Sequence, residues 1–213
     1  MEVNVKGTRK QHWEIIYKSK SPAEVSWFQP HLEKSLELIA ETGIDKKARI
    51  IDVGGGASTL ADDLLKKGHS GLTVLDISSE ALRRSKERLG DRANQITWIG
   101  ADILKANLPK NTFDLWHDRA VFHFLPNPAD RKKYLDLLNQ TLKSKSHLII
   151  ATFGLKGPER CSGLDVIRYS PETLQAGFGE NYRLIKTLEE SHQSPFGTNQ
   201  HFIYCLFQRR GVS

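Results

Sequence analysis

The sequence predicts an α/β fold, in which a doubly wound sheet of seven strands is parallel except for an antiparallel hairpin strand at its C-terminal end. Apolar runs of strand length alternate along the chain with segments of helical periodicity, the pattern of a parallel sheet covered by helices. The last two runs are joined by a segment, 192–200, that is too short for a crossover helix, so we expect them to pair as a hairpin. The 213 residues suit one domain, which we place at 1–213.

Each expected strand is a short apolar run bounded by polar or glycine-containing segments. The seven runs lie at 48–53, 72–76, 96–99, 113–117, 147–153, 182–189 and 201–208. Helix starts and stops lie between them. The expected starts are Ser78 or Ser79, Asn127 before Pro128 and Ser170 before Pro171, and the expected stops are Gly68 and Gly90.

The charge, the lack of long apolar runs and the small number of cysteines limit the kinds of protein that this chain can be. The net charge is +6 and the pI about 9.3, but lysines and arginines are interleaved with acids, so we interpret them as solvated helix faces rather than a nucleic-acid surface. No run approaches the length of a membrane span, and the first residues do not resemble a signal peptide, so we expect a cytoplasmic protein without membrane contact. Two cysteines build neither a disulfide framework nor a CxxC metal site, so no metal is expected.

The segment IIDVGGG at 50–56 predicts a nucleotide-type cofactor site. A buried strand ends there in a glycine-rich turn, and glycines allow a sharp turn and a close approach of the backbone to a ligand. The next strand ends at Asp76, 22 residues after Gly54, where a carboxylate accepts hydrogen bonds from ribose hydroxyls. We therefore expect an adenosine-containing cofactor.

The turn does not complete the dinucleotide fingerprint GxGxxG, because Thr59 occupies the position of the third glycine. Asp52, two residues before Gly54, is unfavourable for a pyrophosphate but suits a cationic amino group. The run IIDVGGGAS, followed by LDIS and by GADI at 100–103, resembles the class I S-adenosylmethionine-dependent methyltransferases, and the resemblance extends over most of the chain. It implies a Rossmann-like fold, S-adenosylmethionine as cofactor and S-adenosylhomocysteine as product.

The resemblance also implies a set of cofactor contacts at the carboxyl ends of the strands. Gly54 and Gly56 accommodate the methionine portion, with Asp52 at its amino group, and Asp76 binds the ribose diol unless it only caps the following helix. Ile77, Ala101 and Ile103 border the adenine, and Asp102 receives its exocyclic amine unless it is a surface carboxylate. Two further residues, Trp27 and His117, are expected at the methionine end.

The segment FDLWHDRAVFHFL, after the fourth strand, is where acceptor and methyl group are expected to meet. His117, Asp118 and His123 are the candidates for a general base, and Arg119 is expected to contact the acceptor. For His123, a packed position among phenylalanines is an equally good interpretation. The sequence HDRA replaces the Asn or Asp, Pro, Pro, aromatic tetrad of methyltransferases that act on exocyclic amines, which disfavours such targets. It resembles instead the small-molecule, thiopurine-like and protein-lysine branches.

Two further segments are expected to close the site. Residues 1–30 are predicted to form an N-terminal lid over a cofactor-binding core at 31–213, although the aromatic residues could instead anchor the first core helix. The polar connection 153–170 contains Arg160 and Arg168, which are predicted to hold an anionic group of the acceptor. Cys161 lies between these two arginines. It is either a contact of the acceptor or a loop thiol without a role in the site.

The predicted function is methyl transfer to an unidentified acceptor, which we expect to be a small molecule. A protein or RNA acceptor stays open, and we expect a monomer or a homodimer. A nicotinamide-dependent oxidoreductase would need a pyrophosphate beside Asp52 and would usually carry a YxxxK pair, which follows neither Tyr134 nor Tyr169. A non-catalytic cofactor-binding protein is the remaining alternative.

Overall fold

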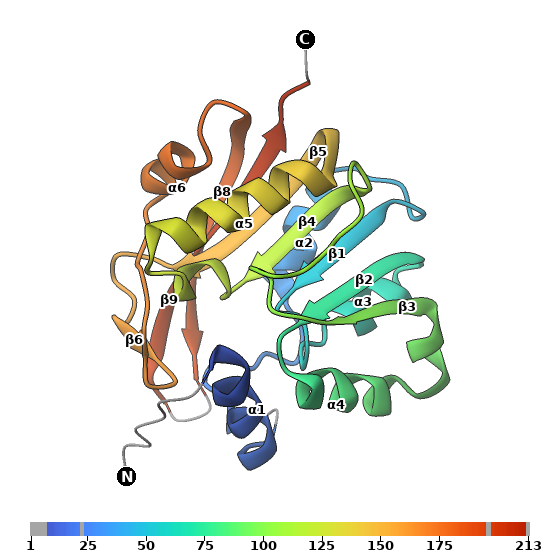
Figure 1. Cartoon of the computed structure of the whole chain (residues 1–213), viewed down its shortest axis with the longest axis vertical. Coiled ribbons are helices and arrows are strands. Elements are labelled where there is room, and N and C mark those ends of the chain that lie inside the picture. The colour runs from blue at the N-terminus through green and yellow to red at the C-terminus, as the bar shows by residue number, and fades with distance from the viewer. Residues whose placement is uncertain (1–7, 22–23, 195–196, 212–213) are drawn as a thin grey trace.

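The computed structural model describes residues 8–21, 24–194 and 197–211, which form a mixed sheet with helices on both faces (Figure 1). The strand order is β3-β2-β1-β4-β5-β9-β8. The first five strands in this order are parallel, and β9 is antiparallel to both β5 and β8. The seven strands are β1 Arg49–Val53, β2 Gly71–Asp76, β3 Ile96–Gly100, β4 Phe113–Arg119, β5 Leu142–Phe153, β8 Tyr182–Gln193 and β9 Asn199–Arg209. The predicted fold class, including the C-terminal hairpin, is confirmed.

Two layers of helices cover the sheet. Side chains of α2, α3 and α4 share one core cluster, and those of α5 and α6 share the other, which lies on the face turned to the viewer in Figure 1. The helices are α1 Arg9–Ser19, α2 Glu33–Glu41, α3 Leu60–Lys66, α4 Ser79–Leu89, α5 Pro128–Thr141 and α6 Pro171–Phe178, with short 3₁₀ turns η2 Gly90–Gln95 and η3 Phe122–Phe124.

The strands alternate between the two clusters because successive side chains point to opposite faces of a sheet. In β5, Leu148 and Ile150 pack with α5 and α6, whereas Ile149 and Ala151 pack with the helices of the other layer. All four side chains are fully buried. The central strands are therefore apolar on both faces, as their sequences indicate.

The predicted helix starts are confirmed by their capping bonds. The Ser78 hydroxyl accepts a hydrogen bond from the amide of Ala81 at 3.2 Å and begins α4. Asn127 and Ser170 cap α5 and α6 in the same way, each followed by proline in the first turn.

The connection after β5 contains structure that the sequence did not predict. A two-residue strand, β6 Arg160–Cys161, pairs with β7 Leu164–Asp165 to form a small hairpin. Strands this short carry no alternating pattern. In addition, β5 begins at Leu142, directly after α5 and earlier than the predicted 147, and β8 continues to Gln193.

The sheet positions the site through its strand order. β1 and β4 are neighbours, and the chain continues from β1 to β2 on one side and from β4 to β5 on the other, which makes this the topological switch point. In open α/β sheets the ligand site lies beyond the carboxyl ends of the strands at such a point. Figure 1 shows α1 at this edge.

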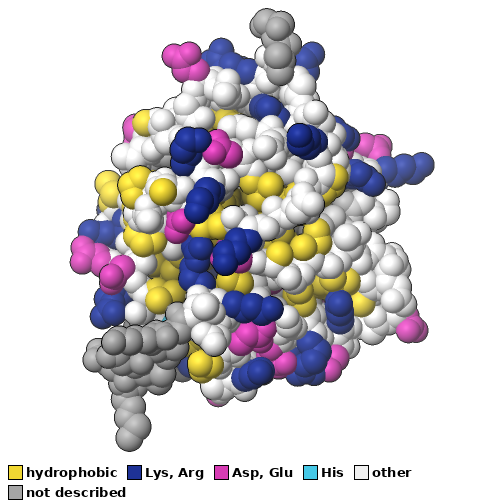
Figure 2. All heavy atoms as spheres, viewed as in Figure 1, with side chains coloured by type: hydrophobic (Ala, Val, Ile, Leu, Met, Phe, Trp, Pro, Cys, Tyr) yellow, Lys and Arg dark blue, Asp and Glu magenta, His cyan; other side chains and the backbone are white. Residues whose placement is uncertain are grey.

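Lysines and arginines are distributed over the face shown in Figure 2, with acidic side chains among them, rather than gathered in one patch. Many form ion pairs on the helices, such as Lys132 with Asp136 at 2.8 Å. This agrees with solvated helix faces. None of the helices in the described ranges combines the length and the apolar character needed to span a bilayer.

Candidate active site

A cavity at the carboxyl ends of the parallel strands encloses about 840 Å³ of empty space, counted to its open mouth. One wall consists of residues that follow β1, β2 and β3, and the other of residues after β4 and from β5, β6 and β9. The lining residues are Arg9, Trp13, Tyr17, Trp27, Val53, Gly54, Leu75, Asp76, Ile77, Ala101, Asp102, Ile103, Arg119, Ala120, Val121, Phe124, Leu125, Phe153, Cys161 and Phe202.

The three glycines of the turn leave no room for side chains. Gly54 has a φ of +73°, and a Cβ there would lie 2.1 Å from Cγ2 of Val121. At Gly55 a Cβ would lie 2.1 Å from Oδ2 of Asp52, and at Gly56 it would lie 2.5 Å from Oδ2 of Asp76. The turn is therefore packed against the two carboxylates that the sequence singles out.

Asp76 lines the cavity at the end of β2. Its Oδ2 accepts from the amide of Gly56 at 2.9 Å and its Oδ1 from the amide of Ser78 at 2.7 Å. Burial raises the pKa of Asp76 to about 6 although these hydrogen bonds oppose the shift. The side chain joins the glycine turn to the start of α4, so its position is fixed by the backbone on both sides.

Asp52 belongs to a buried chain of polar side chains behind the turn. Its Oδ1 lies 2.7 Å from Nδ1 of His117, and Nε2 of His117 lies 2.9 Å from the hydroxyl of Ser35 on α2. Oδ2 of Asp52 is buried and has no hydrogen-bond partner. Asp52 and His117 line a small side pocket that shares Gly54 and Trp27 with the large cavity.

The residues after β2 and β3 line the far side of the cavity. Ile77, Ala101 and Ile103 offer apolar surface there. Asp102 Oδ1 accepts from the amide of Leu104 at 3.0 Å, and its Oδ2 accepts from Nη2 of Arg9 at 3.3 Å. The predicted adenine residues are thus together at one end of the cavity.

Arg119 ends β4 and lies between the two cavities, since it lines both. Its Nε donates to the hydroxyl of Tyr204 at 2.9 Å and its Nη1 to the carbonyl of Trp27 at 3.1 Å. The guanidinium also lies 4.4 Å from the ring centre of Phe202. Its Nη2 is buried without a hydrogen bond, 3.9 Å from Oε2 of Glu190.

Aromatic side chains of α1 and of the segment after it cover this region. Trp13 contacts Trp27 and Phe124, with ring centres 5.7 and 5.1 Å apart, and Tyr17 packs on Trp27 at 6.3 Å. All four line the large cavity. The predicted lid segment 1–30 therefore borders the site over the residues that the structure describes, whereas 1–7 and 22–23 lie outside them.

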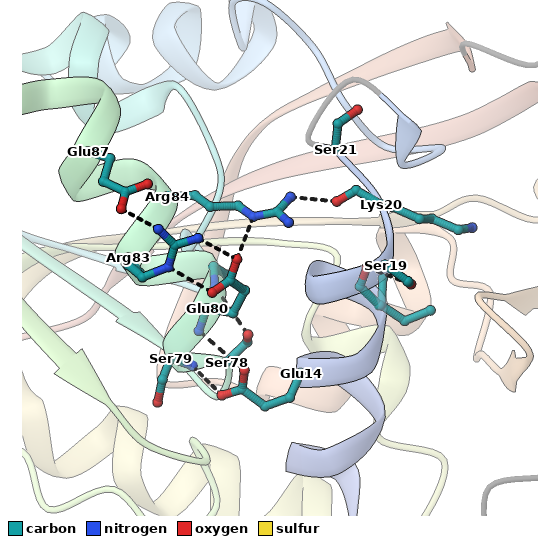
Figure 3. Close-up of polar contacts among 12 residues, drawn as sticks. Glu14, Ser19, Lys20, Ser21, Ser78, Ser79, Glu80, Arg83, Arg84 and Glu87 are labelled. Atoms are coloured by element: carbon teal, nitrogen blue, oxygen red, sulfur yellow. Dashed lines mark hydrogen bonds and ion pairs between the residues drawn. The ribbon is translucent and has the colours of Figure 1, made fainter.

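A polar contact fastens α1 to α4 (Figure 3). The carboxylate of Glu14 accepts from the amides of Ser79 at 2.6 Å and Glu80 at 3.3 Å, the first two residues of α4. A negative charge is favourable at the N-terminus of a helix because of the free amides there. Arg84 of α4 in turn donates to the carbonyl of Lys20. Sequence reasoning missed Glu14 because a capping residue from another helix leaves no local pattern.

None of the three predicted base candidates lines the large cavity, although His117 lines the small side pocket. His117 has both ring nitrogens engaged by Asp52 and Ser35. Asp118 is fully buried, accepts from Tyr134 at 2.6 Å and from the amides of Val121 and Phe122, and so holds the turn η3.

His123 is also fully buried, so the alternative interpretation holds for this residue. Its Nδ1 accepts from the amide of Phe153 at 3.1 Å, and it packs on the rings of Phe124 and Phe153. Burial, together with the nearby charge of Arg119, lowers the pKa of His123 to about 3. A histidine of that pKa stays neutral at physiological pH and is a weak base.

The structure places Arg160 and Arg168, which were predicted to hold the acceptor, away from the large cavity, so their contact with the acceptor stays a prediction. Both line a separate surface depression with Glu159 and Asp165, and neither borders the large cavity. Arg168 pairs with Glu159 and donates to carbonyls of its own loop, and Arg160 pairs with Asp165. Arg160 belongs to the hairpin β6–β7 and its side chain is 63% exposed, whereas the neighbouring Cys161 lines the cavity with a thiol whose pKa is raised by burial.

Phe153 and Phe202 were not predicted as site residues, although both line the cavity. β9 runs antiparallel to β5, so its first residues, rather than its last, reach the carboxyl edge of the sheet, and Phe202 pairs with Phe153 there. The position of Phe202 could have been predicted from the expected hairpin, because the direction of a strand decides which of its ends lies at the site.

Comparisons with known proteins agree with this geometry. Residues 50–145 match the family model described as a methyltransferase domain. The malonyl-[acyl-carrier protein] O-methyltransferase 2 of Ilyobacter polytropus is 27% identical over 137 residues, which cover 64% of this chain and 51% of that protein. EEF1A lysine methyltransferase 2 of Mus musculus is 22% identical over 222 residues, covering 97% of this chain and 85% of the mouse protein. The chain spans between 16% and 46% of the length of several other curated relatives that it matches.

A solved structure supports the fold. The Burkholderia thailandensis 1,6-didemethyltoxoflavin-N1-methyltransferase, with bound 1,6-didemethyltoxoflavin and S-adenosylhomocysteine, superposes with a TM-score of 0.71 at 15% identity and covers 99% of this chain and 93% of that one.

The residues of the cavity fit S-adenosylmethionine. Asp76 stands where a ribose would meet the end of β2, apolar residues border the place for adenine, and Asp52 has an open buried acceptor beside the glycine turn for a cationic amine. The matched domain, the strand order with its C-terminal hairpin and the position of these carboxylates lead to one assignment. These findings support a class I S-adenosylmethionine-dependent methyltransferase.

Proposed function

We propose that this protein transfers a methyl group from S-adenosylmethionine to a small, largely apolar acceptor. The observation that carries the proposal is that one cavity extends from the predicted cofactor residues after β2 and β3 to a second wall of aromatic side chains. That wall is formed by Phe124, Phe153 and Phe202 with Cys161, and the guanidinium of Arg119 lies 4.4 Å from the ring centre of Phe202. A cofactor bound along the first wall would present its methionine end toward the second.

For the cofactor, Asp76 would bind the ribose hydroxyls and Ile77, Ala101 and Ile103 would enclose the adenine. Asp102 would accept from the adenine amine and share its carboxylate with Arg9, which already binds it. Gly54 and Trp27 border the methionine end, and Gly56 contributes by leaving space for Asp76.

S-adenosylmethionine supplies an activated methyl group, whose bond to sulfur breaks with its electron pair going to sulfur while an acceptor lone pair forms the new bond. The protein residues align the two partners and exclude water. Such positioning can contribute about 7 to 11 kcal/mol to rate acceleration. Trp13, Tyr17 and Trp27 form the cover that keeps water out, and we infer that α1 acts as a lid.

The cavity wall suggests that no strong general base takes part. Among the lining residues that the structure describes, Asp76 and Asp102 lie at the cofactor end, and burial raises the pKa of the Cys161 thiol. An acceptor that is a neutral nucleophile, or that has already lost its proton, fits such a site.

A protein lysine is the second candidate acceptor. It is favoured by the similarity to EEF1A lysine methyltransferase 2, which extends over nearly the whole chain. A lysine would have to enter as the free amine, because its ammonium form has no lone pair.

The test is transfer of label from a methyl-labelled donor to panels of small thiols, aromatic hydroxyl compounds and amines, compared with peptides and RNA. We expect label in a small molecule, with transfer strongly reduced in Asp76→Ala and retained in Arg160→Gln, whose side chain lies outside the cavity. Label in peptides or RNA alone would reject the small-molecule assignment.

A further inference from the structure

Arg119 carries a buried hydrogen-bond donor that has no acceptor within the described part of the chain. Its side chain is only 6% exposed, and its Nη2 has no hydrogen-bond partner there. Oε2 of Glu190, with which it forms an ion pair, lies 3.9 Å away and is too distant for a hydrogen bond. Burying a charged donor without an acceptor costs free energy, so this nitrogen indicates a ligand.

The other nitrogens hold the guanidinium in place. Nε donates to the hydroxyl of Tyr204 at 2.9 Å, and Nη1 donates to the carbonyl of Trp27 at 3.1 Å. The hydroxyl of Tyr204 in turn donates to Glu190 at 2.7 Å. The guanidinium is therefore positioned before a ligand arrives, and binding does not have to order it.

Arg119 lines the large cavity together with the aromatic wall. Its guanidinium lies 4.4 Å from the ring centre of Phe202, and the rings of Phe202 and Phe153 are 4.8 Å apart. Arg9, the other basic residue among the described lining residues, is paired with Asp102. Arg119 is thus the cation that a ligand on the aromatic wall would meet, with apolar surface beside it.

The cavity offers an acceptor no residue that is suited to remove its proton. Among the described lining residues, the carboxylates Asp76 and Asp102 lie at the cofactor end. Burial raises the pKa of both Tyr17 and Cys161, so these two side chains stay protonated near neutral pH. The acceptor therefore has to bring a lone pair that is already free.

We propose that the acceptor is a small apolar carboxylic acid, bound as its carboxylate, and that Nη2 of Arg119 donates to one of its oxygens. The proposal rests on the methyl transfer put forward under the proposed function. A carboxylic acid has a pKa of about 4 and is ionised at neutral pH, so it needs no base. A guanidinium is a preferred partner of a carboxylate. Since Nε and Nη1 are engaged within the protein, Nη2 holds one oxygen and leaves the second free to react.

In the reaction, the free oxygen of the carboxylate donates a lone pair to the methyl carbon of S-adenosylmethionine. The bond between that carbon and sulfur breaks, and its electron pair stays on sulfur. The products are a methyl ester and S-adenosylhomocysteine, and no proton is transferred. The charges of the carboxylate and of the sulfonium disappear together, which is favourable beside apolar side chains because buried charge is costly. Tyr204 is a positioning residue, because it acts through Arg119.

The test measures methyl transfer from a methyl-labelled donor to benzoate, phenylacetate and hexanoate, each compared with its amide. Thiols, aromatic hydroxyl compounds and amines are assayed in parallel. A methyl ester releases its label as volatile methanol in mild base, whereas a methyl group on nitrogen or sulfur does not. We expect base-volatile label from at least one of the acids and none from the amides.

Arg119→Gln and Arg119→Lys are then compared with wild type, with Arg160→Gln as a matched control outside the cavity. We expect Arg119→Gln to raise the KM for the acid by about 10- to 100-fold, the usual value of a hydrogen bond to a charged group. Its affinity for S-adenosylhomocysteine, measured by calorimetry, should stay within about twofold of wild type. Arg119→Lys should fall between, and the control should match wild type.

Label in thiols, hydroxyl compounds or amines but in none of the acids would overturn the carboxylate assignment and leave methyl transfer to a small molecule in place. An unchanged KM for the acid in both Arg119 variants would also overturn it, because another group would then bind the carboxylate. So would a loss of S-adenosylhomocysteine affinity as large as the loss for the acid, which would show that Arg119 supports the donor site or the fold. Label in no small molecule would reject the proposed function itself.

Discussion

Nδ1 of His117 lies 2.7 Å from Oδ1 of Asp52, and the two side chains pair from adjacent strands at the same level of the sheet. Because Ser35 occupies the other ring nitrogen, the histidine has no free position for proton transfer. While Oδ1 of Asp52 contacts the histidine, Oδ2 of Asp52 lies beside Gly55. A Cβ built at Gly55 would lie 2.1 Å from this oxygen. The residue predicted as a base is thus a support of the glycine turn.

Replacing His117 with Ala should weaken cofactor binding and destabilise the fold. Asp52 would lose its partner while it stays buried, and an unsatisfied buried group costs about 1 to 3 kcal/mol. Urea denaturation and titration with S-adenosylhomocysteine measure the two effects. Loss of methyl transfer with normal binding and stability would instead restore His117 as a catalytic base.

Gly55→Ala should lower the affinity for S-adenosylhomocysteine, because its Cβ would overlap Oδ2 of Asp52. Gly177→Ala is the matched control. No atom lies within 4 Å of a Cβ at this position in α6, and alanine is favoured over glycine within helices by about 0.5 to 1 kcal/mol. The control should be slightly more stable than wild type and bind equally well. Equal binding by Gly55→Ala would show that the turn tolerates a side chain.

The raised pKa of Asp76 gives a pH dependence of stability. Burial raises it from 3.8 to about 6, so the folded chain retains a proton that the unfolded chain releases between these values. The resulting stabilisation is fully present below about pH 4 and is lost as the pH rises through about 6. Asp76→Asn removes this effect, so its free energy of unfolding relative to wild type should increase between pH 4.5 and 7. A difference that stays constant over this range would contradict the assigned ionisation.

Tyr134→Phe should destabilise the protein without affecting the cofactor. The Tyr134 hydroxyl donates to Asp118 at 2.6 Å and accepts from the indole nitrogen of Trp116 at 2.8 Å, and all three side chains are fully buried. Removing the hydroxyl leaves two buried groups unpaired, at a cost of about 1 to 3 kcal/mol. Chemical denaturation should show the loss, with S-adenosylhomocysteine affinity within about twofold of wild type. A large loss of affinity at unchanged stability would place Asp118 in the site after all.

Glu14→Gln should loosen α1 from α4, because the charge of Glu14 accounts for part of its attraction to the free amides at the start of α4 (Figure 3). Such charge and capping effects are worth about 0.5 to 2 kcal/mol. If α1 is a lid, S-adenosylhomocysteine should dissociate several-fold faster, as stopped-flow tryptophan fluorescence would detect. Glu180→Gln, at an exposed carboxylate outside residues 1–30, is the control. An unchanged dissociation rate would indicate that α1 does not limit ligand release.

Sequence patterns predicted the cofactor half of the site well because its residues follow one another along the chain. Asp52, Gly54, Asp76 and Asp102 each come at the end of a strand, and strand ends can be read from apolar periodicity. The structure places Gly54, Asp76 and Asp102 in one cavity and Asp52 in the pocket beside it. Whether they bind the predicted atoms stays a prediction.

The acceptor half was predicted poorly because its members meet only through long-range contacts. Arg119 is held by Tyr204, 85 positions later, and by the carbonyl of Trp27, 92 positions earlier. Arg160 belongs to the small hairpin β6–β7, whose strands are too short to leave a periodic signal, and Arg168 is held by Glu159 and by carbonyls of its own loop. A polar loop near the site was correctly identified, but which of its side chains face inward depends on tertiary structure.

The residues that line the cavity come from two different parts of the chain. Residues 50–103 supply the glycine turn and the carboxylates after β2 and β3, whereas α1 and the chain beyond 120 supply most of the aromatic wall. The matched methyltransferase domain, 50–145, contains the first set but neither Phe153, Cys161 nor Phe202. If these three residues contact the acceptor, as proposed, substitutions there change the molecule that is methylated and leave the donor residues unaltered, so relatives that share the domain need not share an acceptor.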